Sequence, residues 1–101
     1  MTQGSETQQS VTAWGEETFG PCTVPAVLVA RAALEMRELE EAAAQNDAKE
    51  VGHELADVLI ILYRVATLYN LDINTIVDDK MKINRARRWE RKGDGTGRHI
   101  K

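Results

Sequence analysis

Apolar and small residues recur at helical spacing along this 101-residue chain, and the breaks between the periodic segments divide it into four predicted helices. A short first helix begins at residue 11, where Val11, Trp14 and Phe19 share one face, and it ends at Gly20-Pro21. Longer helices are predicted over residues 24–46, 48–69 and 73–89. No stretch alternates well enough to predict a strand, so the expected fold is an all-α four-helix bundle.

Composition at the two ends marks the limits of the helical domain. Residues 1–10 are rich in Gln, Ser and Thr without apolar periodicity, and we expect a flexible arm. Residues 11–92 form the predicted helical domain, and the glycine-rich residues 93–101 are expected to form a C-terminal loop or tail. Within the domain, three polar residues stand where they could cap a helix: Thr23, Asp47 and Asp72.

The middle of the third predicted helix, residues 58–62, is apolar on every side. A helix of that kind is normally buried all round, which a small bundle cannot achieve with its own residues. We therefore expect an interface between identical subunits, and hence a homo-oligomer.

Charge is distributed unevenly. Residues 1–79 hold fourteen acidic and four basic residues, whereas residues 80–101 hold nine basic and two acidic residues. An acidic body with a basic end suits binding of a cation together with a polyanion. The single cysteine, Cys22, permits no disulfide within the chain, and no run is long enough to span a membrane. The expected location is cytoplasmic.

Two pairs of carboxylates stand at i and i+3 in the second and third predicted helices, Glu35 with Glu38 and Glu54 with Asp57. Residues three apart share one helix face, with β-carbons about 5–6 Å apart. If the two helices pack antiparallel, four like charges meet and raise one another's pKa. A hard divalent cation such as Mg²⁺ prefers oxygen ligands. The sequence therefore predicts a Mg²⁺ site for a phosphate substrate, with Glu41 as a further acid nearby.

Basic, polar and aromatic residues offer further candidates for binding a substrate. The fourth predicted helix carries one basic and polar face, which consists of Lys80, Asn84, Arg87 and Arg88. Trp14 and Phe19 are two of five aromatic residues, and they could either anchor the core or stack on a nucleobase. The glycine-rich C-terminal segment could bring backbone amides close to a phosphate, or it could be a mobile tail.

The ordered set of these motifs resembles the MazG-like nucleotide pyrophosphohydrolases of the all-α NTP pyrophosphatase superfamily. The family signature is ExxE, a gap and ExxD, followed by a lysine and an asparagine on the next helix. Here Glu35-x-x-Glu38, Glu54-x-x-Asp57, Lys80 and Asn84 stand in that order, and the resemblance covers about residues 11–99.

The resemblance implies the role of each group. The four carboxylates would be the catalytic site and would ligate two or three Mg²⁺ or Mn²⁺ ions. Lys80 and Asn84 would contact the triphosphate, with Arg87 or Arg88 assisting. From their aromatic character, and not from the resemblance, we expect Trp14 or Phe19 to line the pocket for the base. The family hydrolyses NTPs or dNTPs to the monophosphate and pyrophosphate. Its single-domain members are dimers or tetramers, and we expect a tetramer built as a dimer of dimers.

Residues 14–20 and 93–99 further resemble a phage-associated subset of the family that includes MazZ-type enzymes, which remove dGTP. The expected substrate is therefore a purine dNTP such as dGTP. Other (d)NTPs, including non-standard ones removed in house-cleaning, form an alternative. A different class of function would be a non-enzymatic helical oligomer that binds nucleic acid through its basic C-terminal end. The acidic body argues against it, because nucleic-acid binders usually carry a dominant basic face.

Overall fold

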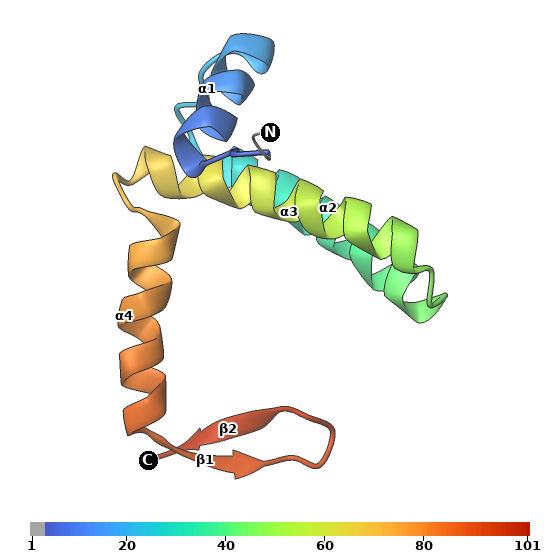
Figure 1. The fold of residues 1–101 in the computed structure, drawn as a ribbon, viewed down its shortest axis with the longest axis vertical. Helices are drawn as coiled ribbons and strands as arrows, with labels where there is room; N and C mark the ends of the chain where they lie inside the picture. The colour runs from blue at the N-terminus through green and yellow to red at the C-terminus, as the bar shows by residue number, and fades with distance from the viewer. Residues whose placement is uncertain (1–3) are drawn as a thin grey trace.

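Four helices and a terminal β-hairpin make up residues 4–101, the part of the chain that this computed structural model describes. The elements in chain order are α1 (Gln8–Phe19), α2 (Pro25–Ala44), α3 (Ala48–Leu68), α4 (Ile73–Ala86), β1 (Arg88–Arg91) and β2 (Gly97–Ile100). The helices α2 and α3 lie side by side, and α1 packs against α3 near one end of this pair (Figure 1). The predicted four-helix all-α body is confirmed.

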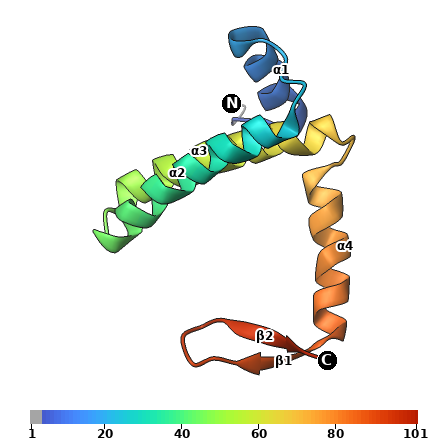
Figure 2. The same ribbon diagram turned by 180° about the vertical axis from the view of Figure 1, so that it is seen from behind.

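The fourth helix leaves the end of α3 and extends away from the α2–α3 pair, with the hairpin at its far end (Figures 1 and 2). In the described part of the chain, α4 has only marginal contacts with the other helices. Its apolar side chains therefore stay uncovered, and Val77 and Ile83 are about half exposed.

Local capping residues explain where the helices begin. Asp47 accepts a hydrogen bond from the backbone N–H of Glu50 at 3.2 Å, which confirms the predicted cap of α3. Asp72 does the same for the N–H of Thr75 at 3.0 Å at the start of α4. The prediction for Thr23 was wrong, because Val24 is the N-cap residue of α2 and has no capping side chain.

The first helix starts three residues earlier than the sequence pattern predicted, at Gln8. Thr7 and Ser10 form a reciprocal cap, in which each side-chain oxygen accepts from the other residue's backbone N–H. This pair of short polar residues stabilises a first turn that lacks apolar periodicity. Residues 8–10 therefore do not belong to the predicted arm, and residues 1–3 of that arm lie outside the described residues.

The prediction for the C-terminus was wrong in two respects. The fourth helix ends at Ala86 rather than Trp89, and residues 93–101 are not simply a loop, because 97–100 pair antiparallel with 88–91. Gly93 and Gly95 adopt positive φ values of 95° and 94°, which reverse the chain between the strands. Asp94 fixes this turn by accepting from the backbone N–H of Thr96 at 2.9 Å. Two short runs flanking a glycine-rich turn are a hairpin signal that the helical pattern obscured.

The buried core is small and lies along the α2–α3 pair and at the contact between α1 and α3. Its apolar members are Val11, Leu28, Ala32, Ala42, Val58 and Ala66. In the block predicted to be buried on every side, Val58 is buried, but Leu59 is 46% exposed. A single copy of the chain therefore leaves part of this block exposed. Among the described residues, no helix has the length and apolar content needed to cross a membrane.

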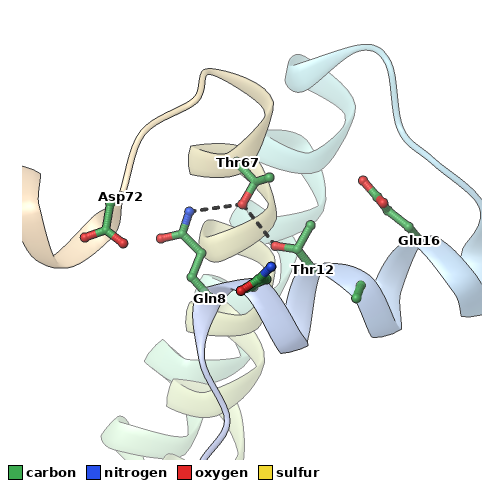
Figure 3. A pocket seen from close by; sticks show the side chains of 7 residues that line it. Gln8, Thr12, Glu16, Thr67 and Asp72 are labelled. Atoms are coloured by element: carbon green, nitrogen blue, oxygen red, sulfur yellow. Dashed lines mark hydrogen bonds between the residues drawn. The ribbon is translucent and has the colours of Figure 1, made fainter.

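Gln8 ties α1 to the connection between α3 and α4 (Figure 3). Its side-chain N–H donates to Thr67 Oγ1 at 3.0 Å and to the carbonyl of Leu71 at 2.7 Å. Its side-chain oxygen accepts from the N–H of Ile73, the first residue of α4, at 2.8 Å. One side chain thus satisfies polar groups on both sides of the connection, and we infer that it helps to set the direction of α4. An open cavity of about 320 Å³ adjoins this amide.

Candidate active site

Three carboxylates from two helices converge on one face of the α2–α3 pair. Glu35 and Glu38 belong to α2 and Glu54 belongs to α3, and an oxygen of each lies within 4.8 Å of an oxygen of the others. Glu35 and Glu54 are buried, whereas Glu38 is exposed. The helix spacing that places i and i+3 on one face, combined with the pairing of α2 and α3, brings three of the four predicted acids together.

Glu54 has the most perturbed environment of the cluster. Burial is the largest cause that raises its pKa from 4.5 to about 7. Hydrogen bonding to the carboxyls of Glu35 and Glu50 and repulsion from Glu38 raise this pKa further. Its Oε1 atom is buried and has no hydrogen-bond partner among the described residues.

This donor set fits a hard divalent cation. Buried polar atoms nearly always have a partner, so the unpartnered oxygen of Glu54 calls for a ligand that is not part of the chain. Within residues 4–101, the one ion pair that reaches the cluster joins Arg31 Nη2 to Glu35 Oε1 at 3.2 Å, and the Arg31 side chain is 62% exposed. All three converging groups are carboxylates, which suit Mg²⁺ or Mn²⁺ better than soft or nitrogen-preferring metals.

Asp57 lies one turn beyond Glu54 on α3 but does not join the three-carboxylate cluster. Its side chain is exposed and lines a neighbouring cavity together with Glu35. The structure thus places Asp57 beside the site, and its role as a metal ligand stays a prediction.

The neighbouring cavity has a volume of about 570 Å³ and lies between α1, α2 and α3. Its lining residues are Trp14, Phe19, Val27, Leu28, Arg31, Glu35, Asp57, Ile60, Ile61 and Arg64. Trp14 and Phe19 meet edge to face with ring centroids 5.4 Å apart, and both are more than half exposed. They are therefore cavity walls rather than core anchors, and an apolar aromatic wall beside carboxylates suits a nucleoside.

The predicted phosphate-binding residues lie elsewhere. Lys80 and Asn84 belong to α4, which extends away from the α2–α3 pair, so one chain does not bring them to the carboxylates (Figure 1). Arg87 is the extended C-cap residue of α4 and Arg88 starts β1, so the predicted helical face ends before these two arginines. The side-chain oxygen of Asn84 is buried without a hydrogen-bond partner among the described residues.

Arg64 is a cavity residue that the sequence patterns missed. It is buried, and it interrupts the apolar run of α3 seven residues after Asp57. A charged residue within an otherwise apolar helix was the available signal. Because the motifs of the acidic pairs did not include it, its position in the cavity wall became visible only in the folded chain.

Comparison with known proteins identifies the family. Residues 24–89 match the MazG nucleotide pyrophosphohydrolase domain, which covers more than half of the chain. The chain belongs to the MazG nucleotide pyrophosphohydrolase family. It is thus a hydrolase that acts on nucleotide phosphoanhydrides, and the acidic cluster of this MazG domain is consistent with Mg²⁺ or Mn²⁺. The hairpin residues after Trp89 lie beyond the matched segment.

Two phage proteins and one solved structure are similar over most of this MazG-family chain. A dATP/dGTP diphosphohydrolase of Cyanophage S-2L is 35% identical over 96 residues, which cover 95% of this chain and 87% of the relative. A dATP/dGTP diphosphohydrolase of Salmonella phage PMBT28 is 33% identical, and the chain spans 31% of its length. A Cyanophage S-2L MazG-like pyrophosphohydrolase bound to dGDP and three catalytic Mn²⁺ ions per active site superposes with a TM-score of 0.76. This neighbour is 34% identical, and the match covers 99% of this chain and 95% of the neighbour.

Proposed function

We propose that the chain hydrolyses a deoxynucleoside triphosphate, with a purine dNTP such as dGTP preferred, to the monophosphate and pyrophosphate. The observation that carries this proposal is the buried Oε1 atom of Glu54, which has no partner among the described residues and lies beside Glu35 and Glu38, next to a cavity with aromatic walls. The names of the two phage relatives and the dGDP in the similar structure support a purine deoxynucleotide as the substrate.

In this proposal, Glu35, Glu38, Glu54 and Asp57 hold two or three Mg²⁺ or Mn²⁺ ions. Such ions, when bound, neutralise phosphate charge and lower the pKa of the attacking water. One of these carboxylates would accept the proton of the attacking water. The water oxygen forms a bond to the α-phosphorus, the bond from this phosphorus to the bridging oxygen breaks, and pyrophosphate leaves. Trp14 and Phe19 cover the base and keep bulk water from it.

We further propose that the working form is a homo-oligomer, with a dimer of dimers favoured. The fourth helix, which has only marginal contacts with the other described helices, and the isolated two-stranded hairpin beyond it are marginally stable in water. A second copy would cover the apolar side chains of α4 and would bring its own Lys80 and Asn84 toward the carboxylates, where Arg87 and Arg88 could assist with phosphate charge. The positive charge of residues 80–101 complements the acidic body of a partner copy.

A substrate panel tests the proposed activity. The chain is incubated with Mg²⁺ or Mn²⁺ and each of the four dNTPs, the ribonucleotides and non-standard dNTPs, and the products are resolved as mono- or diphosphate. We expect pyrophosphate and a monophosphate, with purine dNTPs cleaved fastest. Glu54→Gln should abolish turnover, whereas the matched control Glu40→Gln, an exposed residue of α2 outside the cluster, should retain it.

Two results would overturn the proposal. One is the absence of pyrophosphate from every nucleotide tested, and the other is a Glu54→Gln variant as active as the Glu40→Gln control. A chain that cleaves nothing but retards DNA or RNA at physiological salt would support the alternative of a nucleic-acid-binding oligomer. Faster cleavage of a non-standard dNTP than of dGTP would instead indicate a house-cleaning enzyme.

A further inference from the structure

Arg64 places a buried guanidinium in the wall of the cavity next to the carboxylates, and its side chain has few partners. The residue is 9% exposed. The hydrogen bond that the structure shows for it runs from Nη2 to the carbonyl oxygen of Gly20 and is long, at 3.4 Å. No carboxylate of the described residues lies within ion-pair distance of it, since the ion pairs found there involve Arg31 and Arg98. The other guanidinium nitrogens are not among the described atoms that are buried without a partner, so they reach the space of the cavity, where a ligand can supply an acceptor.

The first helix is shaped to admit this guanidinium. A β-carbon at Gly15 would lie 2.7 Å from Arg64 Nε and 3.0 Å from Cζ, closer than side chains normally approach. Gly15 is buried and follows Trp14 in α1, and Trp14 and Phe19 line the same cavity as Arg64. The missing side chain therefore lets α1 close over Arg64 and hold it beside the two aromatic rings.

The position of Arg64 along α3 fits the length of a nucleoside. Arg64 follows Asp57 by seven residues, which is two helical turns on the same face and about 10 Å of helix rise. Ile60 and Ile61 line the cavity between them. The acidic end of the cavity would therefore take the phosphates, the isoleucines and aromatic rings would contact the sugar and base, and the guanidinium would meet the far edge of the base.

We propose that Arg64 selects purines by donating hydrogen bonds to the N7 edge of the base. A guanidinium offers donors in a planar fork and no acceptor. Both purines present the N7 acceptor on this edge, and guanine adds a second acceptor, O6, where adenine presents the N6 donor. Pyrimidines have no N7. Since this inference rests on the proposed function, it ranks the substrates of that same site as dGTP, then dATP, then dCTP and dTTP.

Substitution of Arg64 tests the inference through a ratio of activities. Arg64→Met keeps the apolar stem and removes every donor, and Arg64→Lys keeps the charge but loses the fork. The measurement is kcat/KM for dGTP, dATP, dCTP and dTTP. We expect Arg64→Met to lower the dGTP-to-dCTP ratio by roughly 10- to 100-fold, the usual value of one bidentate contact, with dCTP itself little changed. The dGTP-to-dCTP ratio of Arg64→Lys should lie between the ratios of wild type and Arg64→Met.

A second variant guards against a simple loss of folding. Gly15→Ala leaves Arg64 in the chain but places a methyl group where the guanidinium lies. Alanine favours helix, so α1 itself should not be weakened. The variant should lower the same dGTP-to-dCTP ratio while the circular dichroism of the helices is kept. Gly52→Ala is the matched control, because a β-carbon at Gly52 of α3 meets nothing within 4 Å. It should leave the ratio unchanged.

Substrate analogues supply an independent readout. In 7-deaza-dGTP and 7-deaza-dATP a C–H replaces N7, so wild type should cleave each several-fold more slowly than its parent, and Arg64→Met should not distinguish analogue from parent. Equal cleavage of analogue and parent by wild type would overturn the inference. So would an equal fall for all four dNTPs in Arg64→Met, which would mean that Arg64 binds phosphate. A wild type that cleaves no dNTP would instead refute the proposed function.

Discussion

The pH dependence of metal binding follows from the environment of Glu54. Its pKa is raised to about 7, whereas a metal ion needs the ionised carboxylate, so protons and metal compete for this site. With that pKa, roughly 91% of the group is ionised at pH 8, roughly 9% at pH 6 and roughly 1% at pH 5. The apparent affinity for Mn²⁺ should therefore fall roughly tenfold from pH 8 to pH 6 and roughly another tenfold to pH 5.

Stability without metal should change in the opposite direction. A carboxyl whose pKa is raised in the folded state stabilises the fold below its unfolded value, 4.5, and this contribution is lost as pH rises through about 7. The melting temperature of the metal-free protein should thus decline across that window. The rise in melting temperature caused by Mn²⁺ should grow across the same window, because ligand binding stabilises the native state.

Isothermal titration with Mn²⁺ between pH 5.5 and 8, alongside thermal melts with and without the metal, measures both effects. Glu54→Gln should bind Mn²⁺ weakly, lose most of the pH slope and melt higher than wild type without metal at pH 8, since it removes a buried charge. Glu40→Gln should behave like wild type. The reasoning is refuted if Mn²⁺ affinity is flat from pH 6 to 8, or if Glu54→Gln keeps the full slope.

Three further predictions concern the carboxylate of Asp57, the hydrogen bonds of Gln8 to the connection between α3 and α4, and the oligomeric state. Asp57→Asn should remove most of the Mn²⁺-induced rise in melting temperature, and an unchanged rise would exclude Asp57 as a ligand. Gln8→Met should cost about 1–2 kcal/mol of unfolding free energy by denaturant titration, because it removes three hydrogen bonds, whereas Gln9→Met, an exposed neighbour, should cost little. Light scattering at micromolar concentration should show an oligomer that Val77→Glu shifts toward smaller species, and a wild-type monomer would contradict this expectation.

Local signals in the sequence were sufficient for most of the helical body. Asp47 and Asp72 cap helices where their side chains reach nearby backbone N–H groups, and such short-range bonds depend on few residues. The reciprocal cap at Thr7 and Ser10 was overlooked because it precedes any apolar periodicity. The C-terminal strands were overlooked because the helical spacing of basic residues continued into Arg87 and Arg88, whereas their pairing partner comes after the glycine-rich turn.

For the candidate site as well, local features could be predicted from the sequence, whereas features that depend on helix packing could not. The spacing within each acidic pair was visible in the sequence, since it depends on the helix period alone. How the two helices pack decided that Glu35, Glu38 and Glu54 converge while Asp57 lies beside the neighbouring cavity. Packing also decided that Trp14 and Phe19 line a cavity and are not buried in the core.

By itself, the sequence determined four helices, their caps at Asp47 and Asp72, and an ordered acidic signature, because helix formation and capping are local. The tertiary structure decided the burial that raises the pKa of Glu54, the close approach of Gly15 to Arg64, and the separation of α4 from the carboxylates. These depend on desolvation and on contacts between residues far apart in the chain, which no local periodicity encodes.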